Sequence, residues 1–577
     1  LSDIAIIREG YNAAAVRGSI MYFVMANLAN IDPMYQYSLA YFKVLFNLCI
    51  ENSDKDEDIP TRVDNINNYA LKNIYTNVCR GLFEKDKLIF SLLLAVGVLM
   101  ERGDISKQEW NLILRGAGLN VNPEPVPSDE CTPAAWNLLF VIETQLPQTF
   151  EGLCDGVAAN WKAWHRWSRN DSPHTATIPD QAYDEDLTEF QRILLVMALR
   201  NEKGSAALSY FVEAKLGRMF VESPPVRLED IYNDMNCRLP AVFILSPGAD
   251  PTGLVMALAR KMNYIERLST ISLGQGQGPK AVKLIENGKK SGDWVMLQNC
   301  HLAKSFMIPL ENMCDDMSQV TLEDGRPNKI ADSFRLYLTS MPASYFPVPV
   351  LQNSVKMTVE PPRGMRANVL RSLTLLNDWT SFDVCEGVHG VPVFRMLAFA
   401  TCFFHAMVQE RVRFGPLGWN IPYEFNDSDI EASVLILKGF LEEQPDIPWD
   451  ALHYMSSVNG YGGRVTDFLD ERCIETILAR FYKPEVLEEG FMLDKKGKYT
   501  IPKGSQSMDQ FKAYVLTLPL VDPPEAFGLH ANAQISLEYS QTRYNINTAL
   551  RLQPRDAGGG GGGEEKTTDE IITELAI

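Results

Sequence analysis

Residues 246–253 occupy the position, between a strand and a helix, at which a nucleotide-binding protein holds phosphate. The apolar run AVFI (241–244) precedes them, and residues with helical spacing follow. Such a loop binds phosphate when its backbone N–H groups are free, its glycines allow a close approach and a lysine neutralises the outer phosphates. The loop reads SPGADPTG, and no lysine follows it. It therefore has the position of a phosphate loop but lacks its main cation.

Asp250 and Pro251 predict that the chain itself closes the N-terminus of this helix. Aspartate is a favoured N-cap residue, and proline is favoured in the first helical turn. The carboxylate of Asp250 would accept the N–H groups that a phosphate would otherwise bind, and its charge would repel an anion. We therefore expect Ser246, Gly248, Asp250 and Pro251 to form an empty, vestigial phosphate loop.

Gln298 and Asn299 stand where the second half of the chemistry would be found. Hydrolysis of a nucleotide uses carboxylates at the end of a neighbouring strand, one to hold Mg²⁺ and one to polarise water. The run WVMLQN (294–299) ends instead in two neutral amides, which cannot replace the charge that the metal needs. The sequence thus predicts no catalytic residue, no metal ligand and no bound cofactor in this segment.

Gly274, Gly276 and Gly278 form a GxGxG run. The dinucleotide-binding fingerprint is GxGxxG, and it requires an acidic residue after the next strand, which this sequence lacks. We predict instead a structural turn that leads into a helix with Pro279 at its first position.

Arg464 lies in the turn NGYGGRVTD (459–467). Because arginine pairs well with carboxylates, we expect it to anchor one within or between domains and so to fix subdomain orientation. An arginine that acts on a neighbour's nucleotide is the alternative. Cys300 and His301 could suggest thiol catalysis, but adjacent residues on a strand point to opposite faces, so we predict no catalytic role for them.

The elements that must position these residues change in type along the chain. Residues 1–120 show helical spacing, and a proline-rich linker follows at 120–133. From 188 to about 360, short apolar runs alternate with helical stretches, which indicates parallel βαβ units. Helical spacing returns after 364. The predicted fold class is α/β, with a mostly parallel sheet flanked by all-helical subdomains.

The composition excludes several kinds of site. A net charge of −19 and a pI near 5.0 disfavour nucleic acid as a partner. Ten cysteines are scattered without metal-ligand spacing, which indicates buried, reduced thiols. No uninterrupted apolar run reaches the roughly 18 residues of a membrane span, so we expect no membrane partner. The first residue is Leu1, and we expect the chain to be a fragment.

Several long runs closely resemble the C-terminal part of a dynein heavy chain motor. They include FILSPGADP, ISLGQGQGPKA, WVMLQNCHLA, NGYGGRVTD and FGLHANA, and the resemblance spans essentially the whole chain. It implies a ring of six AAA+ modules on one chain, of which this segment holds the end of the fifth module, the sixth, and the start of the C-terminal domain. The sixth module of the family binds no nucleotide, and ATP and Mg²⁺ belong to other modules of the parent motor.

The resemblance also implies a division of the chain. Residues 1–123 are expected to form the helical small subdomain of the fifth module, 124–365 the large α/β subdomain of the sixth, and 366–553 its small helical subdomain. Residues 554–577 are expected to form a glycine-rich linker and the beginning of the C-terminal domain. The glycine-rich segment after LQPRDA resembles axonemal heavy chains more than cytoplasmic ones.

The predicted function is that of a non-catalytic ring module in an ATP-driven, minus-end-directed microtubule motor, which transmits conformational change toward the stalk. The implied partners are the rest of the ring, microtubules through the stalk, and light and intermediate chains through the tail. The expected location is the axoneme of a cilium or flagellum, with the cytoplasm as the alternative. Two other interpretations stay open, an independent nucleotide-binding enzyme with an atypical phosphate loop and a scaffold without a motor role.

Overall fold

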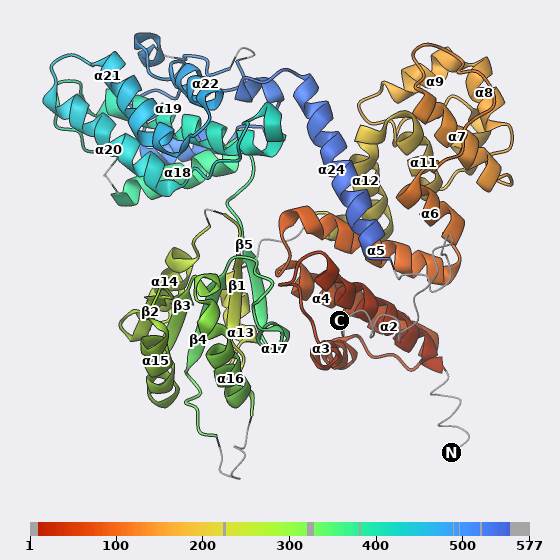
Figure 1. The fold of residues 1–577 in the computed structure, drawn as a ribbon, viewed down its shortest axis with the longest axis horizontal. Coiled ribbons are helices and arrows are strands. Elements are labelled where there is room, and N and C mark those ends of the chain that lie inside the picture. The colour runs from red at the N-terminus through yellow and green to blue at the C-terminus, as the bar shows by residue number, and fades with distance from the viewer. Residues whose placement is uncertain are drawn as a thin grey trace, which may run out of the picture.

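The computed structural model describes residues 10–553 except 223–226, 248, 320–327, 380–381, 489, 495–496 and 520–521. Figure 1 shows four groups of elements, namely N-terminal helices, middle helices, a sheet unit and a C-terminal helical unit, with the long helix α24 between them. The predicted linker and domain start at 554–577 lie outside the described residues.

The described N-terminal group contains five α-helices, three of which begin at side chains that accept free backbone N–H groups. They are α2 (Asn12–Asn27), α3 (Leu39–Asn52), α4 (Ile59–Cys79), α5 (Glu84–Arg102) and α6 (Lys107–Arg115). The side chain of Ser38 caps α3, and that of Asp58 caps α4. Ser106 and Glu109 form a capping box at α6. The described part of this range, residues 10–120, is therefore helical, as the spacing predicted.

The middle helices pack on the N-terminal helices. They are α7 (Pro133–Gln145), α8 (Leu153–Ala159), α9 (Trp161–Ser168), α10 (Gln181–Asp186), α11 (Glu189–Leu199) and α12 (Gly204–Leu216). α12 contacts α5, and α11 contacts α6, and Figure 1 shows this group beside α5 and α6 and away from the sheet. The range 124–365, expected as one α/β subdomain, thus contains a separate helical group and a sheet unit.

The sheet unit has five parallel strands in the order β2-β3-β4-β1-β5. The strands are β1 (Ala241–Leu245), β2 (Leu268–Ser272), β3 (Trp294–Gln298), β4 (Arg335–Ser340) and β5 (Val355–Val359). The helices are α13 (Leu228–Asp234), α14 (Thr252–Lys261), α15 (Gly278–Ser291), α16 (Met307–Ser318) and α17 (Val348–Gln352). Four strands, β1, β3, β4 and β5, lie in apolar runs that the sequence predicted, whereas β2 begins three residues before the predicted run, which starts at Ile271.

Helices cover both faces of the sheet. Alternate strand residues, among them Phe243, Trp294 and Tyr337, pack with α13 and α14. The residues between them, such as Val242 and Leu338, pack in a cluster that includes residues of α15 and α16. Burial on both faces explains why β1 and β3 are nearly continuous apolar runs, whereas the edge strand β2, with sequence LSTIS, is only partly buried.

The C-terminal helical unit has its own hydrophobic core. It contains α18 (Met365–Trp379), α19 (Gly390–Arg411), α20 (Asp427–Glu443), α21 (Trp449–Tyr454), α22 (Phe468–Leu478) and α23 (Met508–Leu516). The apolar stretch from Gly390 to Leu417 is long enough to cross a membrane, but 78% of its most apolar window is buried inside the protein. Packing in this core accounts for its composition. The last described helix, α24 (Asn532–Arg551), runs back from this unit to α5, α6 and α12.

Candidate functional site

The loop after β1 is held by backbone contacts at the carboxyl edge of the sheet. Ser246 N donates to the carbonyl oxygen of Val359 at 3.0 Å, and Ala249 N donates to that of Ser246 at 3.1 Å. Gly248, the predicted glycine of the loop, lies outside the described residues. The loop therefore joins the ends of β1 and β5.

The start of α14 corrects the predicted cap by one residue. Pro251 occupies the N-cap position with φ −84° and ψ 0°, and the helix begins at Thr252. Asp250 lies just before the cap, and its Oδ1 accepts hydrogen bonds from Thr252 N at 2.9 Å and from Thr252 Oγ1 at 2.5 Å. The expected contact between the carboxylate and a helix N–H is present, but it is an Asx-type turn ahead of the helix.

Leu254 and Val255 occupy the positions that matter most for phosphate chemistry. The spacing from Gly248 to Gly253 is GxxxxG, after which a nucleotide-binding loop has lysine and then serine or threonine. Here Leu254 is an exposed apolar residue, and Val255 is fully buried in the core beneath the sheet. Neither side chain can bind a phosphate or a metal ion. The GxxxxG spacing is the sequence signal that could have identified these two positions.

Gln298 connects the end of β3 to the loop through a hydrogen bond. Its Nε2 donates to Thr252 Oγ1 at 2.6 Å, and the same hydroxyl donates to Asp250. The three side chains form a continuous hydrogen-bonded chain from the sheet to the loop. Since Gln298 is a neutral amide, this chain supplies no charge for a metal ion.

Asn299 holds the ends of three strands together. Its backbone is left-handed, with φ 55° and ψ 45°, a conformation that asparagine tolerates better than most residues. Its N–H donates to Thr339 Oγ1 of β4 at 3.0 Å, and its Nδ2 lies 3.3 Å from Ser272 Oγ of β2. The contacts of Asn299 are therefore all to the protein itself.

Cys300 and His301 lie in a 3₁₀ turn, Cys300–Leu302, because β3 ends at Gln298. The argument from opposite faces of a strand is therefore wrong for this pair. Cys300 is fully buried, and burial raises the pKa of its thiol to about 12. His301 Nδ1 accepts the N–H of Met341 at 3.1 Å. The thiol is thus protonated at neutral pH, and a ring nitrogen of the histidine is engaged by the backbone.

The three glycines of the GxGxG run differ in what they require. Gly276 has φ +76°, which favours glycine, and Gly278 opens α15, where a Cβ would lie 3.0 Å from Cδ2 of Phe306. A Cβ on Gly274 would meet no described atom within 4 Å. Pro279 lies in the first turn of the helix, as predicted.

Arg464 forms its ion pair inside the C-terminal helical unit. Its Nε lies 2.7 Å from Oδ1 of Asp429, which belongs to α20. A second carboxylate of α20, Asp427, pairs with Arg371. Burial raises the pKa of Asp427, and the charge of Asp250 acts in the same direction.

A cleft of about 770 Å³ lies beside the loop. Its walls come from the loop, the start of α5, the segment 360–363, the end of α19, residues 422–425 and the middle of α24. Two of its carboxylates have arginine partners, Glu410 with Arg413 at 2.6 Å and Glu360 with Arg363 at 3.7 Å. Within the part of the chain that the structure describes, no cluster of three or more His, Cys, Asp or Glu side chains could hold a metal ion.

Comparison with protein families decides what this arrangement is. Residues 236–358 match the family model of the dynein heavy chain region D6 P-loop domain, and residues 394–533 match that of the dynein heavy chain AAA lid domain. The chain belongs to the dynein heavy chain family. The P-loop match covers β1–β4 and most of β5, and the lid match lies in the C-terminal helical unit, so the predicted α/β AAA+ class is confirmed.

Three similar proteins show how much of a dynein heavy chain this segment represents. Dynein axonemal heavy chain 6 of Homo sapiens is 44% identical over 99% of this chain and 14% of its own length. Dynein axonemal heavy chain 3 of Mus musculus is 39% identical over 99% and 14%. The dynein-1-beta heavy chain of the flagellar inner arm I1 complex of Chlamydomonas reinhardtii is 37% identical over 95% and 12%. The dynein segment thus spans about one seventh of the length of these relatives. The predicted resemblance to axonemal heavy chains is confirmed.

Proposed function

We propose that this segment is a non-catalytic ring module of an axonemal dynein motor and that it transmits conformational change produced by nucleotide elsewhere in the heavy chain. The observation that carries the proposal is the hydrogen-bonded chain from Gln298 through Thr252 to Asp250. It occupies the region in which a P-loop domain would hold phosphate and Mg²⁺. Leu254 and Val255 add apolar side chains at the lysine and serine or threonine positions. The loop is therefore proposed to connect parts of the fold rather than to bind a nucleotide.

A second set of contacts supports a mechanical role, because it joins the sheet firmly to the N-terminal helices. Thr358 N donates to the carbonyl oxygen of Arg80 at 2.8 Å, and Thr358 Oγ1 donates to that of Leu82 at 2.9 Å. Glu84 N donates to Glu360 Oε2 at 2.7 Å. The turn between α4 and α5 therefore covers the outer edge of β5, and a rotation of the sheet would carry the N-terminal helices with it.

The partners and location of the whole motor follow from family membership as part of the same proposal. The parent chain uses ATP and Mg²⁺ in other modules, moves toward microtubule minus ends, and binds microtubules through its stalk. Light and intermediate chains bind its tail, and the site of action is the axoneme. This segment contacts the rest of the ring.

Thermal unfolding of the 577-residue chain with and without Mg·ATP tests the catalytic part of the proposal. A ligand at about one thousand times its Kd stabilises a fold by about 4.1 kcal/mol, so a site with a Kd of about 1 μM would be visible at about 1 mM nucleotide. We expect no shift. A shift that Leu254→Trp removes, while the same substitution at the exposed Leu302 leaves it unchanged, would support the independent nucleotide-binding enzyme instead.

Gliding of microtubules by the full heavy chain tests the mechanical part. Two cysteines that cross-link the α4–α5 turn to β5 should leave gliding unchanged, because this joint is proposed to be rigid. A cross-link across the cleft between residues 422–425 and the start of α5, which both line it, should slow gliding, because the C-terminal helical unit is proposed to move relative to the N-terminal helices. Equal gliding of both cross-linked motors and the reduced motors would contradict transmission through this module.

A further inference from the structure

α24 is the element that links two separate hydrophobic cores. Near its start, Ala533 is buried in the core of the C-terminal helical unit, and Leu537 packs against the same core. Near its end, Ala549 belongs to the core that the N-terminal and middle helices share, and Ile546 packs against that core. Its 20 residues span about 30 Å. Between the two ends, the helix forms one wall of the cleft.

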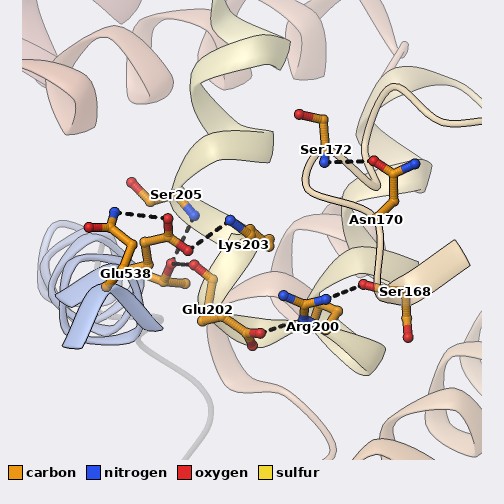
Figure 2. A network of polar contacts seen from close by, with 10 residues as sticks. Ser168, Asn170, Ser172, Arg200, Glu202, Lys203, Ser205 and Glu538 are labelled. Atoms are coloured by element: carbon orange, nitrogen blue, oxygen red, sulfur yellow. Dashed lines mark hydrogen bonds and ion pairs between the residues drawn. The ribbon is translucent and has the colours of Figure 1, made fainter. Parts of the chain in front are cut away.

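The first polar attachment of α24 is to the start of α12. Figure 2 shows Lys203 directed at Glu538, with Nζ and Oε2 3.0 Å apart, and Ser205 next to it. Ser205 N donates to Thr542 Oγ1 at 2.8 Å, and Asn545 Nδ2 donates to Ser205 Oγ at 3.0 Å. Thr542 is fully buried. About two turns of α24 are therefore fixed by complementary polar contacts.

A close approach of the two helices accompanies this attachment. A Cβ built on Gly204 would lie 2.6 Å from Cγ2 of Thr542 and 2.3 Å from Sδ of Met197. Any larger residue at this position would displace either α24 or the methionine. The spacing between α12 and α24 is thus set by a glycine.

The second polar attachment is a buried carboxylate in the first turn of α5. Asp86 is fully buried, and it accepts hydrogen bonds from Tyr544 Oη of α24 and, at 2.7 Å, from Tyr35 Oη. Tyr35 Oη in turn accepts the N–H of Phe83 at 3.0 Å. A buried carboxylate that loses one of its donors is costly. Asp86 therefore fixes where α24 crosses the N-terminal helices.

We propose that α24 is a rigid rod that carries rotation of the C-terminal helical unit to the N-terminal and middle helices, and that Asp86 is the residue that positions it. The inference rests on the proposed function and names the route of transmission. The unit is joined to the rest of the chain by the segment 360–364 at its start and by α24 at its end, with the cleft between them. Both ends of α24 are held, so a displacement of one end would be carried to the other. Interfaces between domains of one chain commonly permit relative motion, so the C-terminal helical unit could rotate relative to the other helices.

Distance distributions between two spin labels in the 577-residue chain test the rod. One label replaces Leu48 on α3 and the other replaces Leu435 on α20, both exposed, with unnatural amino acids that spare the native thiols. The wild-type chain should give one narrow distribution. Tyr544→Phe removes the hydroxyl that donates to Asp86. Adding Thr542→Val also removes the hydroxyl that accepts the N–H of Ser205. The distance distribution should widen in the single variant and widen further in the double variant. Tyr539→Phe, the same change at an exposed position of α24, is the matched control.

Hydrogen exchange separates loss of the rod from loss of folding. Amides of α24 should exchange about tenfold faster in Tyr544→Phe, the effect of losing one hydrogen bond to a charged group, while amides of α19 and α4 keep their wild-type rates. A distribution as narrow in the double variant as in the wild-type chain would overturn the rod, and so would a wider distribution in Tyr539→Phe. Neither result depends on nucleotide, so the rod can fail while the proposed absence of hydrolysis stands.

Discussion

The amide Nε2 of Gln298 lies 2.6 Å from the hydroxyl oxygen of Thr252, and this contact joins the end of β3 to the first residue of α14. In a hydrolytic P-loop domain, the strand end and the loop are connected through Mg²⁺ and phosphate. Here a side-chain amide reaches the loop directly, and Thr252 passes the connection on to Asp250. The end of β3 and the start of α14 are therefore connected by side chains of the chain itself.

Replacing Gln298 tests how much this contact stabilises the fold. Gln298→Ala should lower the free energy of unfolding by about 1 kcal/mol, the loss of one partly buried hydrogen bond. Gln298→Glu should cost more, since a single hydroxyl proton cannot serve both Glu at 298 and Asp250, whose charges repel. Urea unfolding measures both. Gln275→Ala, at an exposed position, should change the value by less than about 0.5 kcal/mol, and equal losses in all three variants would contradict the role of the contact.

Lys356 makes the stability of the chain depend on pH. It is buried in β5, where its Nζ donates to the carbonyl oxygen of Leu351 at 2.6 Å and lies 4.1 Å from the ring centre of Tyr37. Burial, together with the charge of Arg80, lowers its pKa to about 7. The groups around it include Tyr41 and the ion pair of Arg80 with Asp234.

The direction in which stability changes with pH follows from proton binding to Lys356 in the folded and unfolded chain. Between a folded pKa of about 7 and its higher unfolded value, the unfolded chain binds more protons, so stability rises with pH. From pH 6 to pH 9 this one group should add about 2 to 3 kcal/mol. Urea unfolding of wild-type chain and Lys356→Met at both pH values isolates it, because the remaining groups are common to both. Identical changes in the two proteins would show that Lys356 does not titrate in this range.

The sequence was sufficient to place most of the strands, because an apolar run is a local property; the loss of phosphate chemistry stays a prediction. A buried strand is a continuous apolar run, and a missing lysine or carboxylate is visible in the residues themselves. The position of the cap was missed by one residue because Pro251 adopts helical angles before the first helical residue. Only the structure could show contacts between distant parts of the chain: Tyr544 and Asp86, which share a hydrogen bond, are 458 residues apart.

The grouping of the middle helices shows the same limit. The spacing of apolar residues in α11 and α12 predicts that each helix has a buried face, but it does not say which element will cover that face. The structure places them on α5 and α6. The family comparison begins at residue 236 and is consistent with a sheet unit that starts after these helices.

Gly81 determines how closely the α4–α5 turn approaches β5. A Cβ at this position would lie 2.9 Å from Oη of Tyr37 and 3.1 Å from Cβ of Lys356. Gly81→Ala should therefore lower the free energy of unfolding by about 1 to 3 kcal/mol through overpacking. Gly439→Ala is the matched control, because Gly439 lies inside α20 and a Cβ there would meet no described atom within 4 Å.

The control should move in the opposite direction. Alanine is favoured over glycine inside a helix by about 1 kcal/mol, so Gly439→Ala should stabilise the chain while Gly81→Ala destabilises it. Urea unfolding of the two variants gives the comparison directly. A loss of stability at both positions, or at neither, would mean that the approach of the turn to β5 does not depend on the small residue.

Arg464 should stabilise the C-terminal helical unit locally, because its partner Asp429 is part of α20 and also closes the capping box with Asn426. Arg464→Ala leaves a buried carboxylate with one donor fewer, which should cost about 1 to 2 kcal/mol. Hydrogen exchange should then rise in α20 and in the turn around Arg464 and stay unchanged in the five strands. Arg472→Ala, at an exposed arginine of α22, should change neither region. Faster exchange in the sheet of Arg464→Ala would show that the arginine also fixes the orientation of the unit, because only a contact that reaches the sheet could loosen it.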